Sequence, residues 1–163
     1  MTEVLAIREK HDGALGDRSS VKLWLRLLSC TMAMEKDVQR RLAAHGATLA
    51  RFDVLAALDR HRDGMNMGAL SRALLVSNGN VTQLVQKLAK DGLVRIAPSP
   101  ADRRATIVRL TPHGRSEFAG LAAAHHDWID GLLAGMDAET RESLYQALGA
   151  LKRSIAKGQS LGS

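Results

Sequence analysis

The residues best suited to a specific chemistry are amides and lysines in a stretch, residues 65–90, that contains no Asp or Glu. Within it, Gly79, Gln83, Gln86 and Lys90 recur every three to four residues, which places them on one face of a helix. Exposed helices normally mix Glu with Lys, so a carboxylate-free polar face is unusual. Amide side chains can bond adenine edges in a DNA major groove, and lysine can reach guanine or phosphate. The pattern predicts a helix that reads double-stranded DNA.

More basic residues occupy a proline-bearing loop between two β-prone runs, residues 93–96 and 106–110. Arg103 and Arg104 at the tip of this loop could enter a minor groove or bind phosphate. Asp102 could orient one guanidinium group while the other contacts DNA. The alternative is a solvated turn whose surface ion pair contributes little to stability.

The net positive charge of the chain comes from residues 64–115. Residues 64–115 contain eight Lys/Arg and two acids, a net charge of +6 that equals the net charge of the whole chain. The remaining sequence has equal numbers of basic and acidic residues. A localised basic surface is typical of a polyanion-binding protein, although a solvated basic face would have the same charge.

The periodicity of apolar residues predicts a mainly α-helical fold with a small β-hairpin. Helices are expected over about residues 20–44, 49–60, 67–75, 78–91, 112–134 and 138–155. Their candidate N-caps are Ser19 or Ser20, Thr48, Ser77, Thr111 and Asp137, and Asn66 or Met67 is expected to start the third helix. Val81, Leu84, Val85 and Leu88 form one apolar stripe on the fourth helix, opposite its polar face.

Helix, turn, helix and hairpin in this order are the plan of a winged helix-turn-helix. The chain is expected to comprise an N-terminal arm and helix (1–46), a winged helix-turn-helix lobe (47–111), C-terminal helices (112–156) and a flexible tail (157–163). The long first helix carries apolar residues on more than one face, so it is expected to pack against another chain.

The composition argues against several other classes of protein. Five aromatic residues are too few for a base-stacking platform, so single-stranded nucleic acid is disfavoured. The single cysteine, the lack of a signal sequence and the lack of a long apolar run predict a cytoplasmic protein without a membrane association. No arrangement of catalytic residues or cofactor-binding motif was found, so we expect neither an enzyme nor a cofactor. His125, His126 and Asp127 are disfavoured as a metal site, because adjacent helical residues do not share a face.

Two segments, LSRALLVSNGNVTQLVQKLAKDGLVRI (70–96) and SPADRRATIVRLTPHGR (99–115), resemble the MarR family of bacterial transcriptional regulators. The resemblance implies a homodimer, with the first and the last two helices as the dimerisation region, and a palindromic operator. It implies a repressor that a small molecule releases from DNA. The residues expected to contact DNA are Arg72, Ser77, Asn78, Gly79, Asn80, Thr82, Gln83, Gln86, Lys87, Lys90, Arg95, Arg103 and Arg104.

The resemblance also implies an effector pocket between the dimerisation helices and the DNA-binding lobe. The candidate lining residues are Arg26, Cys30, Met34, Arg51, Phe52 and Trp128, and an aromatic acid or its coenzyme A thioester is the expected effector. Some relatives sense oxidants through a cysteine, but a buried, inert Cys30 is favoured here, since free cysteines are usually buried. The alternatives are an oxidant-sensing repressor acting through Cys30 and a winged-helix protein-interaction module.

Overall fold

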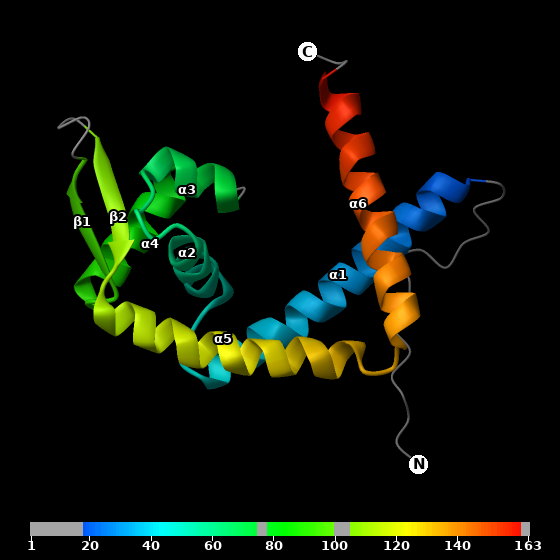
Figure 1. The fold of residues 1–163 in the computed structure, drawn as a ribbon, viewed down its shortest axis with the longest axis horizontal. Helices are drawn as coiled ribbons and strands as arrows, with labels where there is room; N and C mark the ends of the chain where they lie inside the picture. Colours follow the sequence, from blue (N-terminus) through cyan, green and yellow to red (C-terminus); the bar gives the residue numbers. More distant parts are fainter. Residues whose placement is uncertain (1–17, 75–77, 100–104, 161–163) are drawn as a thin grey trace. The chain divides into compact units, whose positions relative to one another are not determined.

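The computed structural model describes residues 18–74, 78–99 and 105–160, which form six helices and a two-stranded antiparallel sheet (Figure 1). The elements are α1 (Ser19–Ala44), α2 (Leu49–Arg60), α3 (Met67–Leu74), α4 (Asn78–Lys90), β1 (Val94–Pro98), β2 (Thr106–Leu110), α5 (Pro112–Leu133) and α6 (Ala138–Ser160). Two compact units, residues 1–126 and 127–163, divide the chain within α5. The mainly α-helical fold with a hairpin wing is confirmed.

Side chains cap four of the helices, and three of these caps, Thr48, Thr111 and Asp137, are the ones that the sequence predicts. Thr48 Oγ1 accepts a hydrogen bond from the backbone N–H of Arg51 at 3.2 Å, and Asn66 Oδ1 accepts one from Ala69 at 2.8 Å. The other two caps are formed by the bonds from the Gly114 N–H to Thr111 Oγ1 at 2.9 Å and from the Thr140 N–H to Asp137 Oδ1 at 2.7 Å. Each bond satisfies a donor that the first turn of a helix leaves unpaired. The predicted cap Ser77 lies outside the described residues.

Two predicted helix ends are wrong. The first helix already includes Ser19, and Arg18 occupies the N-cap position without a side-chain capping bond, so neither Ser19 nor Ser20 is the cap. The last helix continues to Ser160, so that residues 157–160, expected in a flexible tail, are helical. Two features allow the helix to continue this far. Lys157 lies in its last turn, where a positive charge interacts favourably with the helix dipole. Gly158 lowers the stability of the helix by only about 1 kcal/mol.

The core of the first unit lies between α2, α3, α4 and the hairpin. Val81, Val85 and Leu88 of the predicted stripe on α4 have no exposed surface, whereas Leu84 is partly exposed. The other fully buried large side chains in this unit are Leu42, Val54, Leu55, Leu58, Leu70 and Val108. Burial of one such side chain contributes roughly 1.5–3 kcal/mol, so this core fixes which face of α4 points to solvent.

The hairpin is attached to the helices by a short bridge between α2 and α3. Val94 pairs with Leu110 and Pro98 with Thr106, while Met65 exchanges two backbone hydrogen bonds with Val108, at 3.0 and 2.8 Å. Gly64 precedes this bridge with a φ of +87°, and a Cβ there would lie 2.5 Å from Ile107 Cγ2. Only glycine satisfies both the backbone conformation and the close approach.

Within the described residues, no helix is both long enough and apolar enough to cross a membrane.

Candidate nucleic-acid interface

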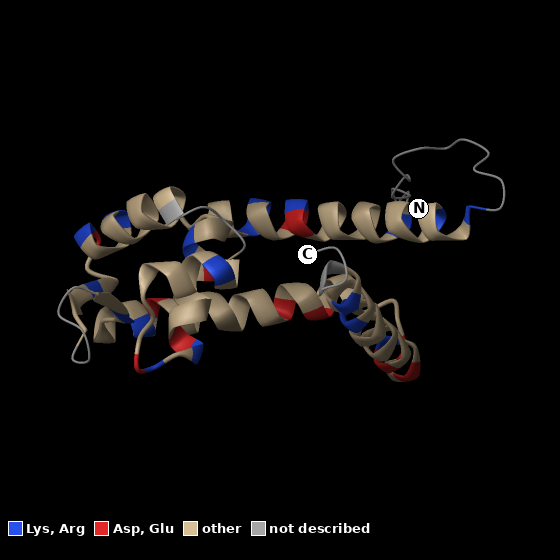
Figure 2. Cartoon of the chain, turned by 90° about the horizontal axis from the view of Figure 1, so that it is seen from above, with Lys and Arg blue, Asp and Glu red and all other residues tan. Residues whose placement is uncertain are grey.

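The polar face of α4 is exposed, as its spacing predicts. Gly79, Gln83, Gln86 and Lys90 are all exposed and lie opposite the buried valines and leucine. Asn80 and Lys87 are exposed beside them, and Thr82 is partly exposed. In Figure 2, the residues of α4 include lysines but neither Asp nor Glu. The helix thus presents amide and ammonium groups, with no carboxylate that would repel phosphate.

Contacts at its C-terminal end hold α4 against α2. Arg51 Nη1 lies 3.0 Å from Asp91 Oδ2, one residue beyond the end of α4. The pair is partly exposed, so it contributes at most about 1 kcal/mol to stability. The pair also matters for the charge of the surface, because Arg51 neutralises Asp91, the acid that follows the polar face of α4. Arg51 was expected from the sequence in an effector pocket, and its pairing with Asp91 was not predicted.

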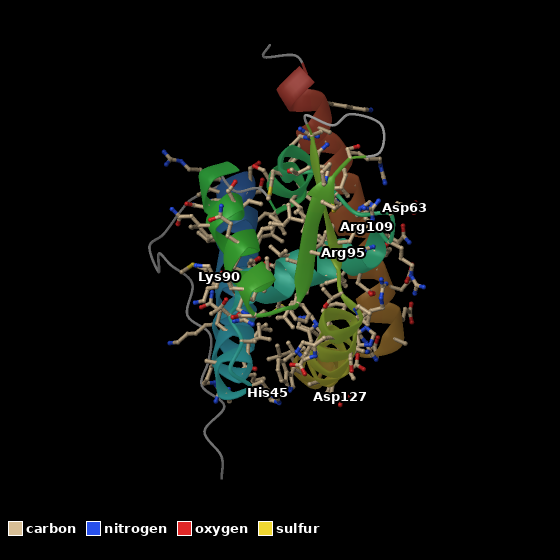
Figure 3. All side chains as sticks on the ribbon, turned by 90° about the vertical axis from the view of Figure 1, so that its left-hand side faces the viewer. His45, Asp63, Lys90, Arg95, Arg109 and Asp127 are labelled. Atoms are coloured by element: carbon tan, nitrogen blue, oxygen red, sulfur yellow. The ribbon has the colours of Figure 1, made fainter. Side chains whose placement is uncertain are left out.

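Each strand of the hairpin carries one arginine that is exposed or partly exposed. Arg95 on β1 pairs with Arg109 on β2, and side chains that are directly opposite on antiparallel strands lie roughly 5 Å apart on one face. Arg95 is exposed and Arg109 partly so (Figure 3). Two like charges at this separation destabilise a hairpin unless an anion lies near them. Arg109 was not among the predicted DNA contacts, although strand alternation and register could have identified it.

The other predicted contacts lie partly outside the described residues. Arg72 is exposed on α3, but the expected wing residues Asp102, Arg103 and Arg104 are not described. Asn78 begins α4, and its side chain is not described. The roles of Asn78, Asp102, Arg103 and Arg104 at the DNA interface therefore stay predictions from the sequence.

The six residues predicted to line an effector pocket have different surroundings. Phe52 is buried, with its ring centroid 5.6 Å from that of Phe118 and 4.7 Å from that of His125. Arg26 is exposed and Met34 is partly buried on α1, whereas Trp128 belongs to the second unit. A hollow of about 610 Å³ in the first unit is lined by none of the six. A pocket formed by the six stays a prediction.

Cys30 is exposed, so the expectation of a buried thiol is wrong for the single chain. Its neighbour Ser29 is the buried residue, and the Ser29 hydroxyl donates a hydrogen bond to the Leu25 carbonyl at 2.9 Å. Successive helical residues are rotated by about 100°, so Cys30 points away from the buried face on which Ser29 lies. The general tendency of free cysteines to be buried does not show on which face of a helix a particular cysteine lies.

His125 packs on the aromatic ring of Phe52. Burial lowers the pKa of His125, the adjacent His126 lowers it further, and Asp53 opposes the shift. Among the described residues, no three His, Cys, Asp or Glu side chains are grouped so that they could hold a metal ion. The contact between His125 and Phe52 instead joins α5 to α2.

Asp53 gives a prediction of pH-dependent stability. Burial raises the pKa of this half-buried carboxyl above its ordinary value of 3.8 and Glu35 raises it slightly more, whereas His125 and Arg60 lower it. Because its pKa is raised in the folded state, the contribution of Asp53 to stability is greatest at low pH and falls as the pH rises through the folded-state value. Asp53→Asn should therefore gain stability over the wild type between about pH 4 and neutrality.

Urea unfolding of both proteins from pH 4 to 8 measures this effect, with Asp63→Asn on the exposed turn after α2 as the control. A difference between Asp53→Asn and the wild type that does not grow with pH would contradict the raised pKa.

Helix, turn, helix and antiparallel hairpin together define a winged helix-turn-helix protein, and comparisons with known proteins assign its family. The sequence profile of the MarR family matches residues 45–105. A MarR family transcriptional regulator from Silicibacter pomeroyi has a crystal structure that is similar over 86% of this chain and 99% of that chain, with 34% identity and a TM-score of 0.73. The chain belongs to the MarR family.

Two further proteins extend the comparison. The transcriptional activatory protein BadR of Rhodopseudomonas palustris is 37% identical over 62% of this chain, and the match spans 59% of BadR. The structure of a mutant MarR from E. coli complexed with operator DNA shares the fold over 81% of this chain and 94% of that chain, with 21% identity and a TM-score of 0.70. The chain is a transcriptional regulator of the MarR type, a non-enzymatic class that acts by binding DNA.

Proposed function

We propose that the protein is a homodimeric, ligand-responsive repressor that binds a palindromic operator in the cytoplasm. The exposed, carboxylate-free face of α4 is the observation that carries this proposal. In each subunit, α4 would lie in a major groove, with Gln83 and Gln86 at base edges and Lys87 and Lys90 at guanine or phosphate. The hairpin would follow the adjacent backbone, with Arg95 supported by Arg109. Two such helices would be separated by roughly 34–36 Å, one turn of DNA.

Exposed apolar side chains support the homodimer. On α1, Leu23, Trp24 and Met32 are each more than half exposed in the single chain. On α6, Tyr145 is 72% and Ile155 is 52% exposed. On α6, Ile155 also shares one face with the exposed Leu144 and Leu148, and a contiguous exposed apolar patch marks a surface that another chain covers. A dimer in turn matches the symmetry of a palindromic operator.

Repression requires only that the bound dimer occupy a promoter, so it is the simplest consequence of the proposed DNA binding. Release by a small molecule would follow if that molecule favours a state in which the two lobes cannot fit successive grooves. The aromatic acid or coenzyme A thioester inferred from the family resemblance is part of this proposal. A reporter under the promoter of the protein's own gene should be more active when the gene is deleted, whereas an activator would give the opposite result.

Substituting Gln83 should change base preference. Gln83→Ala removes one amide from the reading face, and loss of a bidentate base contact costs about 1–3 kcal/mol against the preferred base pair. The variant should therefore discriminate less between the operator and single-base variants, at an unchanged slope of affinity against salt. Fluorescence-anisotropy titrations measure both quantities, with Gln146→Ala on exposed α6 as the control. Full discrimination by Gln83→Ala would show that this face does not read bases.

Substituting the wing should change salt dependence instead. Arg103→Ala combined with Arg104→Ala should weaken binding to all duplexes alike. It should also reduce the slope of log affinity against log salt by about 0.9 for each phosphate that the variant no longer neutralises. Titrations between low and physiological salt check this result. If the slope is unchanged, these arginines do not contact phosphate. If the wild type shows no salt-sensitive duplex binding at all, a protein-interaction module becomes the better account.

A further inference from the structure

A hollow in the first unit lies between α1, α2, α3 and α4, and none of the six residues expected to line an effector pocket contributes to it. Its volume of about 610 Å³ is within the range of roughly 300–1,000 Å³ that small-molecule sites occupy. Leucine, valine and alanine side chains from α2, α3 and α4 form much of its wall. An apolar wall with a few polar groups is the usual construction of a ligand site.

The polar groups in this wall determine which ligand it suits. Glu35 and Gln39 come from α1, Asp53 comes from α2, and Lys87 comes from α4. Two carboxylates against one ammonium give the wall a net negative charge. Lys87 is exposed, whereas Asp53 is half-buried and has lost part of its hydration. A cation near Asp53 would replace that lost hydration, while the carboxylate of an aromatic acid would be repelled.

Three side chains of α4 belong both to this hollow and to the proposed DNA contacts. Asn80, Gln83 and Lys87 line the hollow, and all three are exposed on the polar side of the helix. Residues that are three or four positions apart lie on the same side of a helix, so the edge of the polar face that these three residues form borders the hollow. A ligand that binds these side chains would reduce their availability to DNA.

We propose that this hollow binds a small organic cation, a protonated amine on an apolar body, through Glu35 and Asp53. By occupying the hollow, the ligand competes with DNA for the amide side chains of Asn80 and Gln83. The competition rests on the proposed DNA-binding function, whereas the binding of the cation does not. Because such coupling is reciprocal, the cation lowers the affinity for DNA by the same factor by which DNA lowers the affinity for the cation.

Three probes with the same apolar body but different charge test the binding step in the absence of DNA. Titration calorimetry of the full chain with benzylamine, benzyl alcohol and benzoate at pH 7.5 should show the tightest binding for benzylamine. Benzoate should bind at least tenfold more weakly. Glu35→Gln combined with Asp53→Asn should weaken benzylamine at least tenfold and abolish the preference over benzoate, whereas Glu117→Gln on exposed α5 should change nothing.

A second variant fills the hollow without changing its charge. Ala50→Phe places a ring in the wall, and it should weaken all three probes alike. Benzoate binding as tightly as benzylamine, or unchanged benzylamine binding in the charge variant or in Ala50→Phe, would overturn the site.

The competition with DNA has its own readout. Benzylamine should lower the affinity of the wild type for its operator, and the charge variant should not respond at the same concentration. If benzylamine binds but DNA affinity does not change, the cation site stands and the competition is overturned. If the protein binds no duplex, the proposed function fails, while the calorimetric result still decides the cation site.

Discussion

Replacing Gly114 by alanine is expected to destabilise the winged helix-turn-helix lobe strongly. Gly114 lies in the first turn of α5 and is buried against the start of the hairpin, where a Cβ would lie 1.9 Å from the Leu93 carbonyl oxygen. That oxygen also accepts a hydrogen bond from the Thr111 N–H at 3.0 Å, so it cannot move without breaking a backbone bond. Overpacking of this kind costs about 3 kcal/mol or more, a large part of the roughly 5–15 kcal/mol that stabilises a domain.

Gly120→Ala on the same helix is the matched control. A Cβ at Gly120 meets nothing within 4 Å, so alanine should stabilise α5 by up to about 1 kcal/mol through its better helix propensity. Thermal and urea unfolding of both variants measures the difference. If the two substitutions shift stability equally, the close approach at Gly114 does not determine the junction between hairpin and α5.

The second large effect is expected from charges on the apolar stripe of α6. Leu144, Leu148 and Ile155 are exposed on one face of this helix in the single chain. Leu148→Glu combined with Ile155→Glu would bury two carboxylates in the proposed dimer interface, which is costly without partners. The variant should sediment as a monomer. It should also lose at least about 100-fold in operator affinity, since two linked half-site contacts become one.

Ala150→Glu on α6 provides the control, because Ala150 is exposed and lies away from this stripe. Sedimentation velocity should show a dimer for the control and a monomer for the double variant. A dimeric double variant with full operator affinity would exclude this stripe from the interface. A monomeric variant with full affinity would show that DNA binding does not need the dimer.

Local patterns in the sequence predicted much of the fold. The stripe of Val81, Val85 and Leu88 sets the orientation of α4, so the exposure of Gln83 and Gln86 followed from spacing alone. The caps Thr48, Thr111 and Asp137 also marked helix starts correctly, because a cap and the turn that it caps are adjacent in the sequence. The start of α1 was predicted wrongly, because Arg18 occupies its N-cap position without a side-chain capping bond and therefore leaves no capping pattern in the sequence.

Features that depend on contacts between distant residues were not predicted. The pair of Arg51 with Asp91, the bridge of Met65 to Val108 and the hollow beside α4 each join segments that periodicity treats separately. Cys30 was misplaced for a related reason, because burial of one residue depends on which helix face its own chain covers. The charge of the hollow is the most consequential omission, because it points to a different effector from the aromatic acid expected from the family resemblance.

The most direct test of the account is the affinity of the full chain for the duplex upstream of its own gene, compared with a scrambled duplex of equal length. Fluorescence anisotropy at several salt concentrations should show a preference of at least about 10³ for the upstream duplex and a steep loss of affinity with salt. Gln83→Ala should lower the preference and leave the salt slope unchanged. Equal affinity for both duplexes, or affinity that does not depend on salt, would contradict the assignment of α4 as a DNA-reading helix.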